Sequence, residues 1–239
     1  MDAVRTTTIA PESFTKQLKA ARRLAARVER QLSDMDLYGW FNAPYDPAEL
    51  LRCFPLVRLK DGHRLDAYQY LAGSNGNGFV FVVPADRRLP PPPEELELTW
   101  RQGIIPTLKA AGLPDWAHHD IEAFLEPEGS PLSYFHCSLL IRELRELGAM
   151  WHGAEWSTHE IVTELDPELA ARLTWFGDPP EELLPVVETA GPSEATVRFH
   201  TFTGYVQEQI VCHSDTYRGG VCTCRSRQVI AAGEVGFIY

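Results

Sequence analysis

Two histidines and a glutamate stand close together in the segment MWHGAEWSTHEIV, which covers residues 150–162. A neutral imidazole binds a metal ion or accepts a proton, and imidazole nitrogens combined with a carboxylate are typical of zinc hydrolases. We therefore predict a zinc-type site in which His136, His152 and His159 are the metal ligands. Glu155 would act as a base or as a fourth ligand, so Glu155 and His159 are the candidate catalytic residues.

The same segment also fits an ordinary helix start. Ser157 and Glu160 match a capping box, in which each side chain accepts a hydrogen bond from the backbone N–H of the other residue. Trp156 and Ile161 occupy the two positions of a hydrophobic staple around that box. The pattern predicts a helix that begins at Ser157. His159 would then lie in the first turn, where the helix dipole disfavours the imidazolium and keeps the ring neutral.

Three cysteines near the end of the chain form a second candidate metal site. Cys212 precedes a turn, and Cys222 and Cys224 follow it, so a hairpin would bring three sulfur ligands for zinc together. Paired cysteines of structural zinc sites usually have about two to four residues between them, which is not the spacing found here. The alternative is that these thiols fill the core of a sheet as small hydrophobic groups.

Several helices are expected to position the candidate residues. Apolar residues recur every three or four positions from Pro11 to about Met35, which predicts an amphipathic helix. Capping residues and stop signals predict further helices over residues 46–53, 115–125 and 130–148. In the second of these, His118 and Glu122 would share one face and could share a metal ion or a proton.

Two regions are expected to form strands. The sequence RLDAYQYLAGSNGNGFVFVV predicts an antiparallel hairpin over residues 64–83, with its turn at Asn75-Gly76 or Asn77-Gly78. Short segments rich in β-branched and aromatic residues predict a C-terminal antiparallel sheet over residues 196–239. Because strands and helices are segregated along the chain, we predict an α+β fold.

One stretch is a candidate domain boundary. The run Leu89-Pro90-Pro91-Pro92-Pro93 is a stiff polyproline segment that cannot join a helix or a central strand. It could divide a lobe of residues 1–89, with a helix and the hairpin, from a lobe of residues 94–239. Single domains also carry such connectors on their surface, so we predict one compact domain over residues 1–239.

Charge and composition limit the functions to consider. The formal net charge is −11, with +2 over residues 1–36 and −13 over the remainder. This balance argues against binding duplex DNA, which depends on Lys and Arg at the phosphates. We find no apolar run of the roughly 20 residues that would cross a membrane and no signal-peptide pattern. The five cysteines form no disulfide framework. We expect a cytoplasmic protein with reduced thiols.

Two functional hypotheses follow. The first is an acidic interaction module of the inhibitor or immunity type that binds a basic protein partner through complementary charge. It depends on the acidic balance and on the lack of a GxSxG elbow, a P-loop, a kinase motif set or a Cys-x-x-Cys pair. The alternative is the zinc-dependent hydrolase described above, with its ligands between residues 136 and 159.

Overall fold

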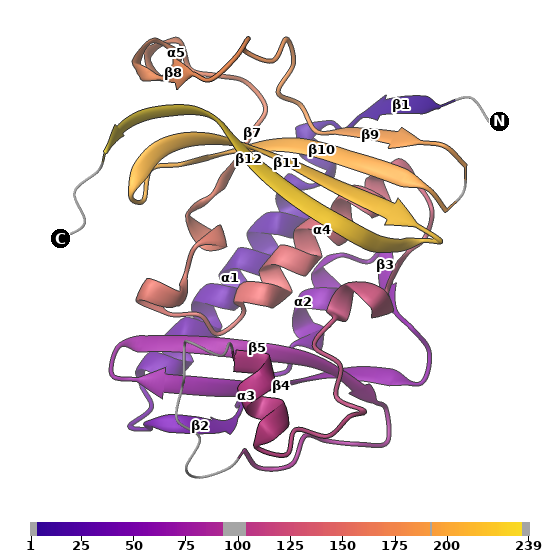
Figure 1. Cartoon of the computed structure of the whole chain (residues 1–239), viewed down its shortest axis with the longest axis vertical. Helices are drawn as coiled ribbons and strands as arrows, with labels where there is room; N and C mark the ends of the chain where they lie inside the picture. Colours follow the sequence, from indigo (N-terminus) through magenta and orange to yellow (C-terminus); the bar gives the residue numbers. More distant parts are fainter. Residues whose placement is uncertain (1–3, 93–103, 192, 236–239) are drawn as a thin grey trace.

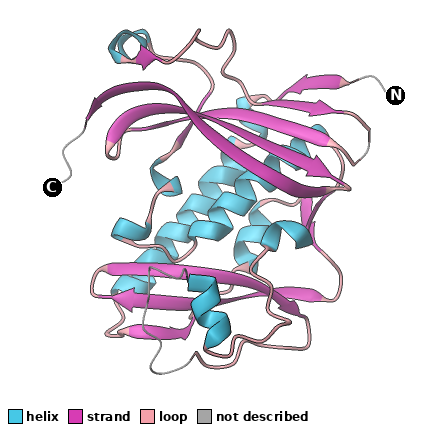
Figure 2. Ribbon diagram, in the orientation of Figure 1, coloured by secondary structure: helices cyan, strands magenta, loops and turns pink. Residues whose placement is uncertain are grey.

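The chain forms three layers, with helices packed between two antiparallel sheets (Figures 1 and 2). The computed structural model describes residues 4–92, 104–191 and 193–235, without the side chains of His152 and Glu234. The predicted α+β class is confirmed, because the strands pair antiparallel and the main helices lie between the sheets. No helix within the described residues is long and apolar enough to cross a membrane.

The elements are helices, helical turns and three sheets; α1, α2 and α4 lie between the two larger sheets, whereas α3 and α5 lie outside that layer. The helices and helical turns are η1 (Pro11–Ser13), α1 (Thr15–Ser33), α2 (Ala48–Cys53), α3 (Ile104–Ala110), η2 (Ile121–Phe124), α4 (Pro131–Glu146), η3 (Trp151–Gly153), η4 (Trp156–Thr158) and α5 (Pro167–Arg172). The large sheet runs in the order β1 (Arg5–Thr8), β9 (Val186–Thr189), β10 (Ala195–Thr203), β11 (Gln207–Arg218), β12 (Val221–Val235) and β8 (Thr174–Trp175), and β7 (Glu160–Val162) also pairs with β10. The second sheet contains β2 (Gly39–Asn42), β4 (His63–Ala72) and β5 (Asn75–Pro84), and the small third sheet pairs β3 (Val57–Leu59) with β6 (Leu125–Pro127).

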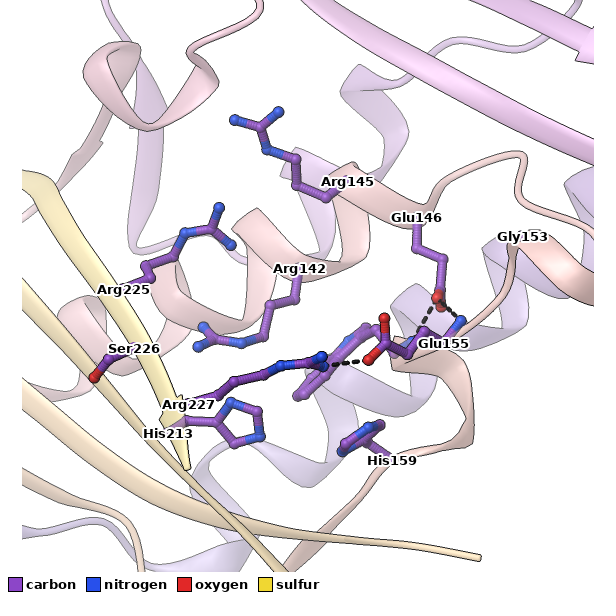
Figure 3. A pocket seen from close by; sticks show the side chains of 11 residues that line it. Arg142, Arg145, Glu146, Gly153, Glu155, His159, His213, Arg225, Ser226 and Arg227 are labelled. Carbon is purple, nitrogen blue, oxygen red and sulfur yellow. Dashed lines mark hydrogen bonds and ion pairs between the residues drawn. The ribbon is translucent and has the colours of Figure 1, made fainter. Parts of the chain in front are cut away.

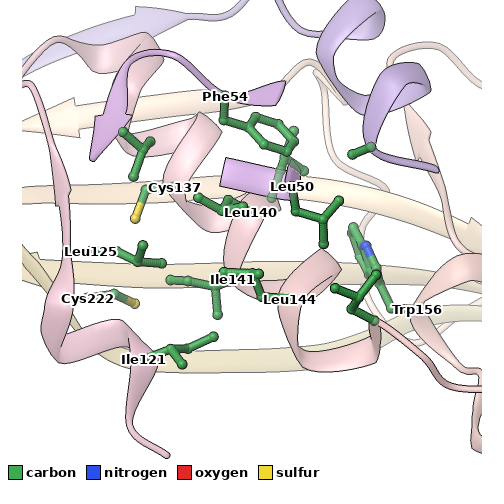
Figure 4. Close-up of a cluster of buried hydrophobic side chains, with 14 of the residues drawn as sticks. Leu50, Phe54, Ile121, Leu125, Cys137, Leu140, Ile141, Leu144, Trp156 and Cys222 are labelled. Atoms are coloured by element: carbon green, nitrogen blue, oxygen red, sulfur yellow. The ribbon is translucent and has the colours of Figure 1, made fainter. Parts of the chain in front are cut away.

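Helix α4 is the centre of the molecule. Ser130 caps its first turn by accepting from the N–H of Ser133, and Pro131 occupies the first helical position, as the sequence predicts. The side chains from Ser133 to Leu144 are all buried, including polar ones. A single apolar stripe would leave half of the helix in water, but α4 contacts β5 in one sheet and both β9 and β10 in the other. Figure 4 shows part of the core around α4.

Helices α1 and α2 confirm two further predictions. The apolar stripe of α1 buries Leu18, Ala21, Val28 and Leu32 against the core. In α2, the carboxylate of Asp46 accepts a hydrogen bond from the N–H of Ala48 at 3.0 Å, which is the capping role expected of it. The cationic side chains of α1 therefore surround a packed face, as in an ordinary surface helix.

The predicted hairpin is present, but its turn lies earlier than expected. Ala72 pairs with Asn75, so the turn is at Gly73-Ser74, and Gly73 has a φ of 62°. The expected Asn-Gly turn residues instead lie within β5. Their glycines serve a different purpose, because the backbone that follows α4 crosses β5 there. The N–H of Met150 donates to the carbonyl of Gly76 at 2.8 Å, and a Cβ at Gly78 would lie 1.9 Å from the carbonyl oxygen of Leu147.

The expected helix over residues 115–125 is wrong. His118 forms an isolated antiparallel bridge with Val82, with N–H to carbonyl distances of 2.9 and 2.8 Å in the two directions. These hydrogen bonds to β5 replace the ones that a helix would form. Only the turn η2 and the strand β6 follow, so His118 and Glu122 do not lie one above the other on a helix face.

The C-terminal antiparallel sheet is confirmed as β10, β11 and β12, and residues 236–239 of the predicted range lie outside the described residues. One cluster of buried hydrophobic residues includes Leu65 and Val82 of the hairpin together with Val187 and Phe199 of the large sheet. The single compact domain over residues 1–239 stays a prediction, with a division into two lobes at residues 89–93 as its alternative, and Pro93 lies outside the described residues.

Candidate functional site

A cavity of about 440 Å³ opens between the end of α4, the segment before β7, and strands β11 and β12 (Figure 3). It is lined by Arg142, Arg145, Glu146, Gly153, Glu155, Trp156, His159, His213, Arg225, Ser226 and Arg227. We call it the arginine cavity, because four guanidinium groups meet there in a chain whose net charge is −11. Two arginines come from α4 and two from β12.

Arg142 forms the inner wall of the arginine cavity and is fixed by a buried ion pair. Its two terminal nitrogens bind the two oxygens of Asp215 at 2.6 and 2.8 Å, and it also donates to the carbonyl of Ser138 at 2.8 Å. The exposed fractions of the Arg142 and Asp215 side chains are 9% and 0%. The guanidinium lies over the rings of Phe199 and Trp156, with 4.9 and 5.6 Å to their centroids. This group therefore presents its charge in a fixed orientation.

Arg145 and Arg225 share one carboxylate. The nearest nitrogen of each lies 2.7 Å from a different oxygen of Glu122, so an arginine from α4 and one from β12 are held side by side. Burial alone would raise the pKa of Glu122, but the hydrogen bond and charge of Arg145, with the charge of Arg225, hold that pKa below its ordinary value. Glu122 stays ionised at neutral pH and keeps both guanidinium groups in place.

Arg227 and Glu155 form the mouth of the cavity. Their side chains are in contact as an ion pair, and both are about two-thirds exposed, at 63% and 65%. An ion pair this exposed contributes little to stability, typically about 0 to 1 kcal/mol. The pair can therefore separate at small cost, unlike the one between Arg142 and Asp215.

Two histidines lie deeper in the wall and are joined through a threonine. The Nδ1 atom of His159 is 2.7 Å from the hydroxyl oxygen of Thr201, and that oxygen is 2.9 Å from Nε2 of His213. All three residues are buried. Burial lowers the pKa of His159 to about 4 and lowers that of His213 further, so both rings are neutral at pH 7. Trp156 stacks on His159 with 5.7 Å between centroids.

Hydrogen bonds to two glutamates of α4 fix the segment that carries Glu155 and His159. The carboxylate of Glu146 accepts from the backbone N–H groups of Glu155, Trp156 and Ser157. In addition, the indole N–H of Trp156 donates to Glu143 at 2.8 Å. The expected helix from Ser157 is therefore wrong. A carboxylate from another element caps these N–H groups, and residues 160–162 leave as strand β7, which pairs with β10.

The structure separates the predicted histidine ligands that it describes. His136 is buried elsewhere on α4, with Nε2 at 3.3 Å from the carbonyl of Ser13 and its ring against Phe54. His159 and Glu155 line the arginine cavity, whereas the side chain of His152 lies outside the described residues. Within the described part of the chain, no three His, Cys, Asp or Glu side chains are grouped so that they could hold a metal ion.

The cysteines are also apart. In the β11–β12 register Cys212 lies opposite Gln228, whereas Cys222 lies opposite Tyr217 and Cys224 opposite Thr216. A register irregularity between Thr216 and Tyr217 accompanies a difference in burial, since Cys222 is buried and Cys224 is exposed. The pairing that would bring the three sulfurs together does not form.

Sequence reasoning missed the arginines, Thr201 and His213. One signal was available, because Arg225 and Arg227 alternate along a strand and Arg142 and Arg145 are three residues apart on a helix. Each spacing places its two cations on one side of an element. The long separation between the two pairs concealed that they face the same cavity.

The buried neutral imidazoles predict an acid-sensitive fold. The pKa of His159 is about 4 in the folded protein and about 6.5 in an unfolded chain. Below about pH 6.5 the unfolded state therefore binds more protons, and stability falls with pH until about pH 4. Between about pH 7 and pH 5, the wild type should lose about 2 kcal/mol more stability than the variant His159→Gln, measured by urea denaturation.

The matched control for this prediction is His118→Gln, because the side chain of His118 is exposed. That variant should lose as much stability on acidification as the wild type does. Burial raises the pKa values of buried Glu143 and half-buried Glu146, so these carboxyl groups act in the opposite direction as the pH falls. They remain in both variants, so they cancel from the comparison. Equal acid sensitivity of His159→Gln and the wild type would contradict the prediction.

Comparison with known proteins yields no relative. No family model matches the chain, and neither a curated protein nor a solved structure matches it. The class of protein is therefore described from its fold and its cavity: it is an α+β protein with an arginine-lined cavity beside strands β11 and β12.

Proposed function

We propose that the protein binds a small anionic molecule with a phosphate or carboxylate group in the arginine cavity. The observation that carries this proposal is the meeting of four guanidinium groups at one cavity of an acidic chain. A guanidinium presents N–H donors in a planar fork that matches phosphate and carboxylate oxygens. A cavity of about 440 Å³ is within the usual range for small-molecule sites.

The carboxylates behind the arginines support binding. Asp215 and Glu122 orient Arg142, Arg145 and Arg225 from the protein side. Each guanidinium has five N–H donors, so donors remain for a ligand after these ion pairs form. Because the groups are already ordered, a ligand does not have to immobilise them, and this lowers the free-energy cost of binding.

The ion pair between Arg227 and Glu155 at the mouth of the cavity is the contact that an entering ligand would replace. Glu155 contacts Arg227, and both side chains are mostly exposed. An anion that enters the cavity would replace the carboxylate of Glu155 as the partner of Arg227. The cost of this exchange is small because the exposed pair is weak, whereas the ligand's charge is partly shielded from water.

Phosphate binding tests the proposal directly. Inorganic phosphate added to the wild-type protein should give a saturable heat in isothermal titration calorimetry and change the fluorescence of Trp156 in the wall. Replacing Arg227 with Gln should weaken binding by about tenfold to a hundredfold, because one charge-assisted hydrogen bond contributes about 1.5 to 3 kcal/mol. Acetate added in place of phosphate distinguishes the two classes of anion.

The matched control is Arg58→Gln. Arg58 also lies on a strand, is also exposed, and also forms an ion pair, with Glu126 at 2.8 Å, but it is outside the arginine cavity. This variant should bind phosphate as the wild type does. If neither anion binds at millimolar concentration, or if both variants lose affinity equally, the proposal is wrong.

The binding of a basic protein partner through the acidic surface stays a prediction. It is independent of the arginine cavity, and it requires that the partner complex weaken as salt concentration rises. A complex whose affinity does not change with ionic strength would contradict it.

A further inference from the structure

The hydroxyl of Thr201 lies between two imidazole nitrogens and has one proton to give. Its oxygen is 2.7 Å from Nδ1 of His159 and 2.9 Å from Nε2 of His213, and Thr201 is completely buried. A neutral imidazole has one N–H and one acceptor nitrogen. For the Thr201 hydroxyl and the two ring nitrogens that face it all to be paired, one ring must donate to Thr201 while Thr201 donates to the other ring.

Two arrangements satisfy this condition. In the first, the N–H of His213 is at Nε2 and that of His159 is also at Nε2, so Thr201 donates to His159. In the second, both rings carry their proton at Nδ1, and Thr201 donates to His213. The two histidines must therefore have the same tautomer. Conversion from the first arrangement to the second takes up one proton at Nδ1 of His213 and releases one from Nε2 of His159.

Both rings line the arginine cavity, but only one of them also borders a second cavity. His213 lines the arginine cavity, where Arg142 and Arg227 are its charged neighbours. His159 lines the arginine cavity and also a second cavity of about 220 Å³ beside Tyr205 and Val206. The ring nitrogens that do not face Thr201 form no hydrogen bond with any described residue. A proton can therefore enter at one ring and leave at the other.

We propose that His213, Thr201 and His159 form a proton relay that removes the acidic proton of a phosphate monoester bound in the arginine cavity. The P–O–H group gives its proton to Nδ1 of His213, and Nε2 of His213 gives its proton to Thr201. Thr201 passes its own proton to Nδ1 of His159, and Nε2 of His159 releases one to water in the second cavity. The ligand becomes a dianion, and no ring gains a net proton.

The charges around the two imidazole rings disfavour an imidazolium, so they favour transfer of the proton through the rings. Burial lowers the pKa of both imidazoles, and Arg142 and Arg227 lower both further, whereas Glu155 partly offsets this for His159. Arg22 also donates to the backbone carbonyl of His159. A second proton on either ring is therefore unfavourable, and a proton can cross this wall only if each ring gives one up as it takes one.

The relay also selects among anions and so deepens the proposed function, on which it depends. A carboxylic acid has an ordinary pKa near 4 and has no proton to give at neutral pH. The second ionisation of a phosphate monoester lies near pH 6, so about a tenth of the ligand at pH 7, and about half at pH 6, is the monoanion that still carries one proton. The dianion that forms matches the four guanidinium groups better, because phosphate accepts several charge-assisted hydrogen bonds at once.

Long-range proton–nitrogen NMR spectra of the imidazole rings test the relay, since they report which nitrogen carries the proton. In the wild type, the ratio of the Nδ1–H tautomer to the Nε2–H tautomer should be the same in His159 as in His213. Inorganic phosphate should shift both rings toward the Nδ1–H form together, because the phosphate dianion accepts from Nδ1 of His213. Calorimetry on the same sample measures whether phosphate binds.

Thr201→Val and Thr201→Ser complete the test. Valine removes the hydroxyl at nearly constant shape, so phosphate should still shift His213 but leave His159 unchanged. Serine keeps the hydroxyl and should retain the coupled shift. Two results would overturn the relay even if phosphate binds. One is a tautomer ratio in wild-type His159 that differs from the ratio in His213, and the other is a coupled shift that persists in Thr201→Val. If phosphate does not bind at all, the proposed function fails and the relay's role at the ligand fails with it.

Discussion

Replacing Asp215 with Asn is expected to lower the free energy of unfolding by about 3 to 5 kcal/mol, the usual cost of leaving one member of a buried ion pair without its partner. Asp215 has no exposed surface and binds both terminal nitrogens of Arg142. Asn has nearly the same shape but no charge, so the guanidinium of Arg142 would remain buried and uncompensated. Urea denaturation at about pH 7 measures the loss.

Asp46→Asn is the matched control for this substitution. Asp46 pairs with Arg52 at 3.1 Å, but the exposed fractions of the two side chains are 44% and 68%, so the change should cost less than about 1 kcal/mol. The double variant Asp215→Leu with Arg142→Met should recover most of the lost stability, because an apolar pair can replace a buried ion pair. It should not recover phosphate binding. Equal effects of the Asp215 and Asp46 substitutions would show that burial is not the cause.

Replacing Gly148 with Ala is expected to cost about 2 to 5 kcal/mol, from backbone strain and from overpacking together. Gly148 has a φ of 82°, a conformation that favours glycine. A Cβ there would lie 2.3 Å from the side-chain oxygens of both Gln69 and Tyr45. These two side chains are not free to move, because Gln69 donates to the carbonyl of Gly148 and Tyr45 donates to Gln69.

Gly112→Ala separates the two causes. Gly112 has a similar φ of 95°, but a Cβ there would meet nothing within 4 Å. It should therefore cost only the strain, about 1 to 2 kcal/mol. Gly148→Ala should also weaken phosphate binding, because the backbone that leaves Gly148 leads to Trp156 and His159. A Gly148→Ala variant that is no less stable than Gly112→Ala would refute the crowding argument.

Local signals predicted the elements whose causes are local. The apolar stripe of α1 and the Ser130-Pro131 start of α4 were each contained within a few residues, and both are confirmed. The hairpin was also predicted, but its turn was misplaced. Glycines that permit a close approach by another segment look the same in a sequence as glycines that permit a turn.

The site was predicted only in part, because distant contacts decide it. The capping box at Ser157 was a sound local pattern, but the carboxylate of Glu146 binds the N–H of Ser157, one of the two backbone groups of that box, and β10 pairs with the residues that follow. Glu155 and His159 were identified as candidates, and both do line the cavity. Their partners Thr201 and His213 lie more than forty residues away, and no spacing rule connects them to the segment.

The pairing of β1 with β9 has a consequence for how the protein forms during synthesis. Arg5 lies opposite Thr189, so these two paired strands are joined by a connection in which the paired residues are 184 positions apart. Contacts that join such distant parts of a chain are slow to form, because a long loop must close before they contribute stability. On the ribosome, α1 and the hairpin can therefore become ordered early, whereas the large sheet and the arginine cavity must wait until most of the chain has emerged.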